Sequence, residues 1–147
     1  MTCILGVPGR FICADRRISE DGGAVSSLIK VASNPWVIAA AAGLAATTYA
    51  VKRAVRAGAE SAEDLVQHVD PGSCALVLSW DGRLAMISER TVWPCREVTA
   101  IGSGSDLALG YLADRGYITS ALLRRAQRFV AKRRADCGGG CDVRGFG

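Results

Sequence analysis

The residues best suited to chemistry stand at the start of the sequence, where Thr2 directly follows Met1. A threonine hydroxyl is a weak nucleophile until a base removes its proton. A free α-amine is such a base, because its pKa of about 8 lies close to neutral, whereas an amide nitrogen has no available lone pair. Removal of Met1 would therefore place amine and hydroxyl on one residue, which is the N-terminal-threonine form of nucleophilic catalysis.

Two charged residues and a glycine could support such a nucleophile. A buried Lys30 would lower the pKa values of the amine and the hydroxyl through its positive charge, and Asp15 would supply the counter-charge. Periodicity alone favours plainer interpretations, namely a surface lysine with a solvated head group and a carboxylate in a turn. Gly43 follows four alanines and is either a helix start or a backbone N–H directed at a developing oxyanion.

Cofactor and metal sites find little support in the sequence. The stretch "GSGSDLALG" (102–110) is similar to a phosphate-binding loop, but the third glycine in register and the lysine of a P-loop are missing. Six cysteines and one histidine are too scattered for a zinc site or a disulfide scaffold. We expect no cofactor and no metal, and the thiols are interpreted as free and buried in a reducing cytosol.

The composition is that of one globular domain, with 147 residues of which half are apolar. The net charge of +4 is concentrated in two helical stretches, which we interpret as solvated helix faces rather than a nucleic-acid surface. Residues 31–51 are uncharged, but Asn34-Pro35 and Gly43 interrupt them, so a buried strand followed by a helix is expected in place of a membrane span. With no signal peptide apparent, we expect a single domain over 1–147, a cytoplasmic location, no membrane contact and no nucleic acid.

Hydrophobic patterning predicts the elements that must position these residues. Pro8-Gly9 and Asp81-Gly82 each indicate a hairpin, Ser61 and Asp64 are close to a capping box, and the glycine-rich tail 136–147 allows a short final strand. The expected strands cover 2–7, 10–18, 24–33, 36–42, 73–80, 83–90 and 96–104, and the expected helices cover 44–58, 61–69, 105–116 and 119–135.

The order of these elements is strands, two helices, strands, two helices, which is typical of the α+β class. Two antiparallel sheets with helices outside them would form a four-layer αββα sandwich. The pattern by itself supports the α+β class and does not fix the four layers.

Five motifs in order, spread over nearly the whole chain, resemble the N-terminal-nucleophile (Ntn) hydrolases of the proteasome β-subunit and HslV type. They are the strand pair that starts on threonine and carries "AD", the lysine strand with its "NP" turn, the "AG" loop, the "GSGS…DRGY" segment, and a late glycine loop. In this sequence they read "MTCILGV…FICADRRIS", "IKVASNPWVIAAAAGLAA", "IGSGSDLALGYLADRGY" and "RADCGGG". The resemblance implies the four-layer αββα Ntn-hydrolase sandwich.

The resemblance also implies roles for individual residues. The catalytic positions would be the nucleophile Thr2, the charged pair Asp15 and Lys30, the oxyanion donor Gly43, and the supporting partners Ser103 and Asp136. The substrate-binding positions would be Ser19, Glu20, Leu28, Ala41, Ala45 and Tyr49. One departure is Gly139, which stands where the family has a serine. The other is the short chain, which puts an anchor for a partner ATPase in doubt.

The function implied by the resemblance is a threonine peptidase inside a self-assembled homo-oligomeric ring, with paired rings. It would cut peptides or unfolded proteins, with a possible ATPase unfoldase as partner, and the small Ala41 and Ala45 would leave an open pocket for large apolar side chains. The alternative within the family is a non-catalytic structural subunit of a larger assembly, bacterial or encoded by a phage. The alternative outside it is a small nucleotide-binding domain.

Overall fold

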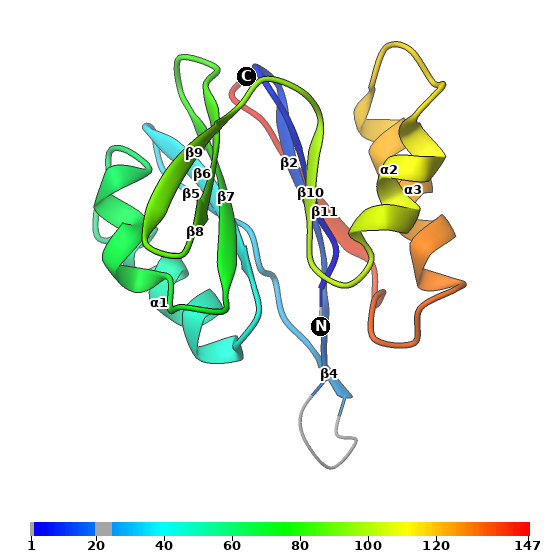
Figure 1. Cartoon of the computed structure of the whole chain (residues 1–147), viewed down its shortest axis with the longest axis horizontal. Coiled ribbons are helices and arrows are strands. Elements are labelled where there is room, and N and C mark those ends of the chain that lie inside the picture. The colour runs from blue at the N-terminus through cyan, green and yellow to red at the C-terminus, as the bar shows by residue number, and fades with distance from the viewer. Residues whose placement is uncertain (1, 20–24) are drawn as a thin grey trace.

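Two antiparallel β-sheets face each other in the middle of the molecule, and helices cover their outer faces (Figure 1). The structure, a computed structural model, describes residues 2–19 and 25–147. The first sheet has the strand order β10-β1-β2-β11, and the second has the order β5-β6-β7-β8-β9. The α+β class and the four αββα layers expected from the sequence are both confirmed.

The element bounds are as follows. The first sheet consists of β1 (Ile4–Val7), β2 (Phe11–Asp15), β10 (Thr99–Ile101) and β11 (Cys141–Arg144). The second consists of β5 (Ala32–Ser33), β6 (Val37–Ala42), β7 (Cys74–Ser79), β8 (Leu84–Ser88) and β9 (Thr91–Cys95). A separate two-stranded ribbon pairs β3 (Arg17–Ser19) with β4 (Val25–Ser27). The helices are α1 (Ala45–Arg56), the 3-10 helix η1 (Glu63–His68), α2 (Ser105–Leu112) and α3 (Ser120–Ala131).

Strand β6 shows how the layers are held together. All six of its residues are buried, because each face of the strand packs against a different layer. Ala39 and Ala41 belong to the core under α1 and η1, whereas Ile38, Ala40 and Ala42 belong to the core between the two sheets. A third core lies between the first sheet and helices α2 and α3.

Several sequence predictions are confirmed at the level of elements. The two expected hairpins form as β1–β2 and β7–β8, and the short final strand forms as β11. The uncharged window 31–51 consists of β5, β6 and the start of α1. Thr119 caps α3, since its side chain accepts a hydrogen bond from Leu122 N. No helix in residues 2–19 and 25–147 is long and apolar enough to cross a membrane.

The expected strand over 24–33 is wrong. The structure has two short strands there, β4 and β5, with 28–31 between them outside any strand or helix. Lys30 therefore lies on an irregular segment. The expected strand over 10–18 likewise divides at Arg16, because β2 pairs with β1 and β11 while β3 pairs only with β4.

Other boundaries also differ. Strand β9 was missed, since Pro94 weakens a strand pattern, but β9 is the last strand of its sheet, where proline is tolerated. The second helix is a 3-10 helix that begins after Ala62 without a side-chain cap, so Ser61 does not cap it. Helix α2 ends at Leu112, before Gly116, and α3 ends at Ala131.

Candidate active site

The Thr2 hydroxyl lies in a buried chain of hydrogen bonds with Lys30 and Asp15. Lys30 Nζ donates to Thr2 Oγ1 at 2.8 Å and to Asp15 Oδ1 at 2.9 Å. The side chains of Lys30 and Asp15 are only 2% and 1% exposed, so their charges interact with little screening by water. The structure therefore brings together three of the predicted catalytic residues, and the surface-lysine and turn-carboxylate interpretations are wrong.

The β1–β2 hairpin positions the carboxylate. Its register pairs Ile4 with Ala14, which places Asp15 next to the residue that follows Thr2. Cys3 N donates to Asp15 Oδ1 at 3.0 Å, and Asp15 N donates to Cys3 O at 3.1 Å. Gly138 N donates to Asp15 Oδ2 at 3.0 Å. The carboxylate thus accepts three hydrogen bonds, two of them from backbone amides.

Two contacts hold the irregular segment that carries Lys30. Leu28 N donates to Arg16 O at 2.8 Å, and the Lys52 ammonium from α1 donates to Ile29 O at 2.5 Å. Burial lowers the pKa of Lys52, and the nearby charge of Arg56 lowers it further. The two residues that precede Lys30 are therefore anchored at the backbone, Leu28 to the β2–β3 junction and Ile29 to α1.

Gly43 lies at a sharp turn between β6 and α1. Its φ of 119° falls in a region that favours glycine, and a Cβ there would lie 2.4 Å from Ser73 Oγ. Ser73 Oγ accepts the N–H of Leu44 at 3.2 Å. The N–H of Gly43 makes no hydrogen bond within the described part of the chain, so this amide is free to bind a ligand oxygen. Sequence reasoning missed Ser73 because it lies 30 residues beyond Gly43.

Ser103 and Asp136 lie near each other but make no hydrogen bond to Thr2 within residues 2–19 and 25–147. Ser103 Oγ is 3.5 Å from Cys137 Sγ. Asp136 pairs with Arg134 at 3.3 Å, and this pairing lowers the pKa of Asp136, with a smaller contribution from a hydrogen bond with Ser103. Gly139 is exposed and has a φ of 72°, so the serine of the family motif would be strained at this position.

Two glycines contribute to the site in ways that the sequence did not reveal. A Cβ on Gly102 would lie 1.9 Å from Thr2 O, so only a glycine permits the turn after β10 to approach Thr2 this closely. The same approach places the first glycine of "GSGS" against the protein's own backbone, which argues against a phosphate loop. Gly138 provides the amide bound by Asp15. Gly102 lies in the "GSGS" motif, and Gly138 lies in the "RADCGGG" motif.

The predicted substrate-binding residues do not all lie on one surface. Ala41 is buried in the core under α1, so its side chain does not line an open pocket. Ala45 and Tyr49 are exposed on α1, and Leu28 is half-buried. The backbone of Ser19 pairs with Val25, while its side chain and the whole of Glu20 lie outside the described residues.

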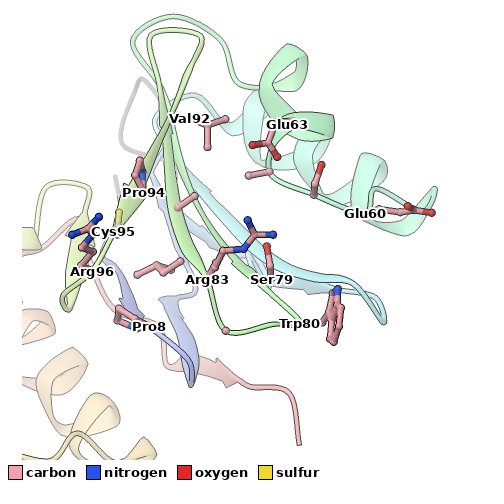
Figure 2. Close-up of a pocket in the computed structure, with 15 residues that line it drawn as sticks. Pro8, Glu60, Glu63, Ser79, Trp80, Arg83, Val92, Pro94, Cys95 and Arg96 are labelled. Atoms are coloured by element: carbon pink, nitrogen blue, oxygen red, sulfur yellow. The ribbon is translucent and has the colours of Figure 1, made fainter.

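Figure 2 shows a cavity lined by a different set of residues. It has a volume of about 500 Å³ and is lined by residues of the β1–β2 turn, the segment before η1, and β7 to β9, including Pro8, Glu60, Trp80 and Arg83. None of the predicted site residues lines it. Within the described ranges, no group of His, Cys, Asp or Glu side chains is placed to hold a metal ion.

No protein-family model matches the sequence, and no curated protein matches it. Similar solved structures include HslV from Trypanosoma brucei, with 21% identity and a TM-score of 0.72 over 97% of each chain. BPH from Thiobacillus denitrificans, in complex with epoxomicin, has 18% identity and a TM-score of 0.76 over 99% of this chain and 97% of BPH. Anbu from Hyphomicrobium sp. strain MC1 has 12% identity and a TM-score of 0.80 over 99% of this chain and 82% of Anbu. Identities this low establish the fold alone: the four-layer αββα chain shares its fold with these structures.

Proposed function

We propose that the chain is a threonine-type peptidase in which Thr2, exposed by removal of Met1, is the nucleophile. The observation that carries the proposal is the buried hydrogen bond from Lys30 Nζ to Thr2 Oγ1. A lysine that is 2% exposed has lost most of its hydration, and such a charge is rarely kept without a structural or chemical use. Here it points at a hydroxyl that, once Met1 is removed, lies on the same residue as the amine that would act as its base.

In the proposed reaction the α-amine takes the hydroxyl proton while Thr2 Oγ1 bonds to the carbonyl carbon of the substrate. The electron pair of the carbonyl moves to its oxygen, where the N–H of Gly43 would stabilise the negative charge. When the C–N bond breaks, the protonated amine of Thr2 returns the proton to the leaving amine. Water, activated by the same amine, then hydrolyses the ester and releases Thr2.

Lys30 would act through charge. Its ammonium stabilises the oxygen of Thr2 as that oxygen loses its proton, and Asp15 compensates the buried charge. Because Asp15 also accepts hydrogen bonds from the amides of Cys3 and Gly138, the carboxylate is held in place and keeps the lysine head group directed at Thr2.

The similar structures support the peptidase proposal at the level of the fold. One is HslV, and another is BPH bound to epoxomicin. By analogy of fold, we infer a homo-oligomeric ring, paired with a second ring, that acts on peptides or unfolded proteins in the cytoplasm. An ATPase unfoldase is a possible partner. Leu28, Ala45 and Tyr49 remain the proposed residues of the substrate pocket.

A non-catalytic structural subunit of the same fold, in a larger assembly, is the second candidate. It is favoured by the surroundings of Asp136, which pairs with Arg134, and by Gly139, which lacks the hydroxyl of the family motif. In the first candidate these residues would help to orient the amine. The two candidates differ in whether Thr2 reacts.

Intact-mass spectrometry after incubation with epoxomicin tests the proposal. We expect loss of one methionine mass from the untreated protein and one covalent adduct on the treated protein, and no adduct on Thr2→Ala. A protein that has lost Met1 but forms no adduct and cleaves no peptide would contradict the peptidase. Retained Met1 in a fully assembled ring isolated from its native source would favour the structural subunit.

A further inference from the structure

Cys141 lies beside a cavity of about 250 Å³ between α3 and the glycine loop that precedes β11. Arg124, Gln127 and Arg128 line the cavity from the helix, and Gly138 and Cys141 line it from the loop and the strand. Cys141 is half-buried, so its thiol is neither fully exposed nor sealed in the core. This cavity shares no residue with the proposed substrate pocket.

The cavity is positively charged. Arg124 and Arg128 are exposed arginines on its rim, and Arg124 Nη1 donates to Cys141 O at 3.4 Å. No carboxylate is among the residues found to line it. Two guanidinium groups around a small cavity favour a ligand with carboxylates, because arginine binds that group with two parallel hydrogen bonds.

Gln127 adds an unsatisfied hydrogen-bond acceptor. Its side chain is 4% exposed, and its Nε2 donates to Cys3 O at 3.0 Å. Its Oε1 has no hydrogen-bond partner in the part of the chain that the structure describes. A buried amide oxygen without a partner is costly, and Gln127 is among the residues that line the cavity, so an amide N–H is the ligand group that suits this wall.

Cys141 also differs from the other thiols near it. The interaction with the Cys13 thiol lowers the pKa of Cys141, with a further contribution from the charge of Arg124, although burial and the charge of Asp142 oppose the shift. Burial raises the pKa of Cys3 to about 12 and raises that of Cys137. Since the thiolate is the nucleophilic form, Cys141 is the thiol of this cluster that is suited to react.

We propose that Cys141 is a modification site that forms a mixed disulfide with a small disulfide bearing carboxylate and amide groups. The thiolate of Cys141 attacks one sulfur of that disulfide. The S–S bond of the reagent breaks, a bond forms between Cys141 Sγ and the attacked sulfur, and the other half leaves as a thiolate that takes up a proton. Cys141 is oxidised and the leaving sulfur is reduced, so no other oxidant is needed.

The modification would reach the proposed active site through the backbone, and this consequence rests on the proposed function. Cys141 pairs with Asp15 across β2 and β11, and Gly138, on the same cavity, donates to the Asp15 carboxylate. A group filling the cavity would shift the glycine loop and, with it, the carboxylate that compensates Lys30. We therefore expect the mixed disulfide to lower the rate of peptide hydrolysis by Thr2.

Oxidised glutathione is the probe, and the readout is the intact mass followed by peptide mapping, which needs no peptidase activity. We expect one glutathionyl group on Cys141, removable by dithiothreitol, and none on Cys141→Ser, whereas Cys95→Ser behaves as the parent protein. Arg124→Glu should slow the modification about tenfold, because it reverses a charge that attracts the reagent and favours the thiolate. Arg125→Glu, on the same helix but away from the cavity, is the matched control.

Cystamine, which carries amines in place of carboxylates, tests the chemical class. It should react with Cys141 about tenfold more slowly than oxidised glutathione at low salt, and the difference should shrink as salt is added. Equal rates for the two reagents, modification of another cysteine, or loss of two hydrogen masses through a Cys13–Cys141 disulfide would each overturn the proposal. Circular dichroism of each variant confirms that it is folded.

Discussion

At the scale of single residues, the Thr2 hydroxyl is both the proposed nucleophile and a partner of the buried Lys30. Thr2→Ala should lower peptide hydrolysis by at least about 1,000-fold, because the covalent route disappears with the hydroxyl. Thr2→Ser keeps a hydroxyl and should keep activity. Initial rates with a fluorogenic peptide check both variants, after mass spectrometry has shown that each has lost its Met1. Undiminished turnover by purified Thr2→Ala would remove Thr2 from the mechanism.

Lys30→Met tests the buried charge. The rate of peptide hydrolysis near neutral pH should fall by orders of magnitude. The variant should also be less stable, because Lys30 and Asp15 form a buried ion pair. Removing one partner of a buried ion pair leaves the other uncompensated, so the free energy of unfolding should fall by about 3 kcal/mol. The loss should stay near the lower end of the range for buried pairs, because Asp15 keeps two backbone hydrogen bonds.

Asp15→Asn in the Lys30→Met background is the control for this change. Removing the second charge should recover part of the lost stability, whereas activity should stay low because the ammonium is still absent. Urea unfolding gives the stability and the peptide assay gives the rate. A Lys30→Met protein as active as the parent would show that the pair is structural only.

At the scale of elements, the N-terminus of α3 depends on Thr119. Its hydroxyl oxygen accepts the N–H of Leu122 at 3.1 Å, one of the amides that the helix itself cannot satisfy. Thr119→Ala should lower the free energy of unfolding by about 1 kcal/mol. Ser120→Ala, one residue along and exposed, should change it little. An unchanged urea midpoint for Thr119→Ala would contradict the role of this cap.

The two faces of β6 and the exposed face of α1 determine which alanines can influence specificity. We expect peptides with Leu, Phe or Tyr before the cleaved bond to be cut faster than those with Asp, because an apolar pocket stabilises large apolar side chains. Ala45 is exposed on α1, and Ala45→Phe should shift the preference toward small residues without loss of stability.

Ala41→Phe is the contrasting variant. Because Ala41 packs in the core under α1, a phenylalanine there should lower the free energy of unfolding by about 3 kcal/mol instead of reshaping a pocket. A fluorogenic peptide panel and urea unfolding separate the two effects. Fastest cleavage after Asp or Glu would show that the pocket is assigned to the wrong residues.

At the scale of the whole molecule, the outer helices α2 and α3 offer little apolar surface for assembly. Their residues Leu112, Leu122 and Leu123 are buried against the first sheet. Leu109 and Tyr117 are exposed, Tyr117 by 74%. Contacts between copies would therefore rely on a few exposed side chains of α2 and of the turn that follows it.

We still expect a closed homo-oligomeric ring at micromolar concentration, measured by light scattering. Leu109→Glu should weaken the pairing of rings, since it places a charge on the outer face of α2. Ala57→Glu lies on the opposite helix layer, just after α1 (Figure 1), and serves as the control with the same introduced charge. A monodisperse monomer would contradict the ring.

The sequence by itself determined the fold class, both hairpins and the start of the last helix near 119, and it singled out Thr2, Asp15 and Lys30 as candidate site residues. The fold class and the hairpins follow from local sequence patterns, and the candidate site residues follow from motifs that occur in the family's order. Both kinds of signal can be detected in one sequence. Local patterns failed where a neighbour in space decides the outcome. The single strand expected through Lys30 does not form, because β4 pairs with β3 whereas β5 pairs with β6 in another sheet.

Only the tertiary structure decided which residues meet. Asp15 binds Cys3 across 12 residues and Gly138 across 123, and no period in the sequence encodes either contact. The need for glycine at 102 arises from the carbonyl of Thr2, and the side of β6 on which Ala41 lies arises from sheet register. Composition and periodicity describe a residue and its near neighbours, whereas a site is made by backbone atoms that the fold brings within hydrogen-bonding distance.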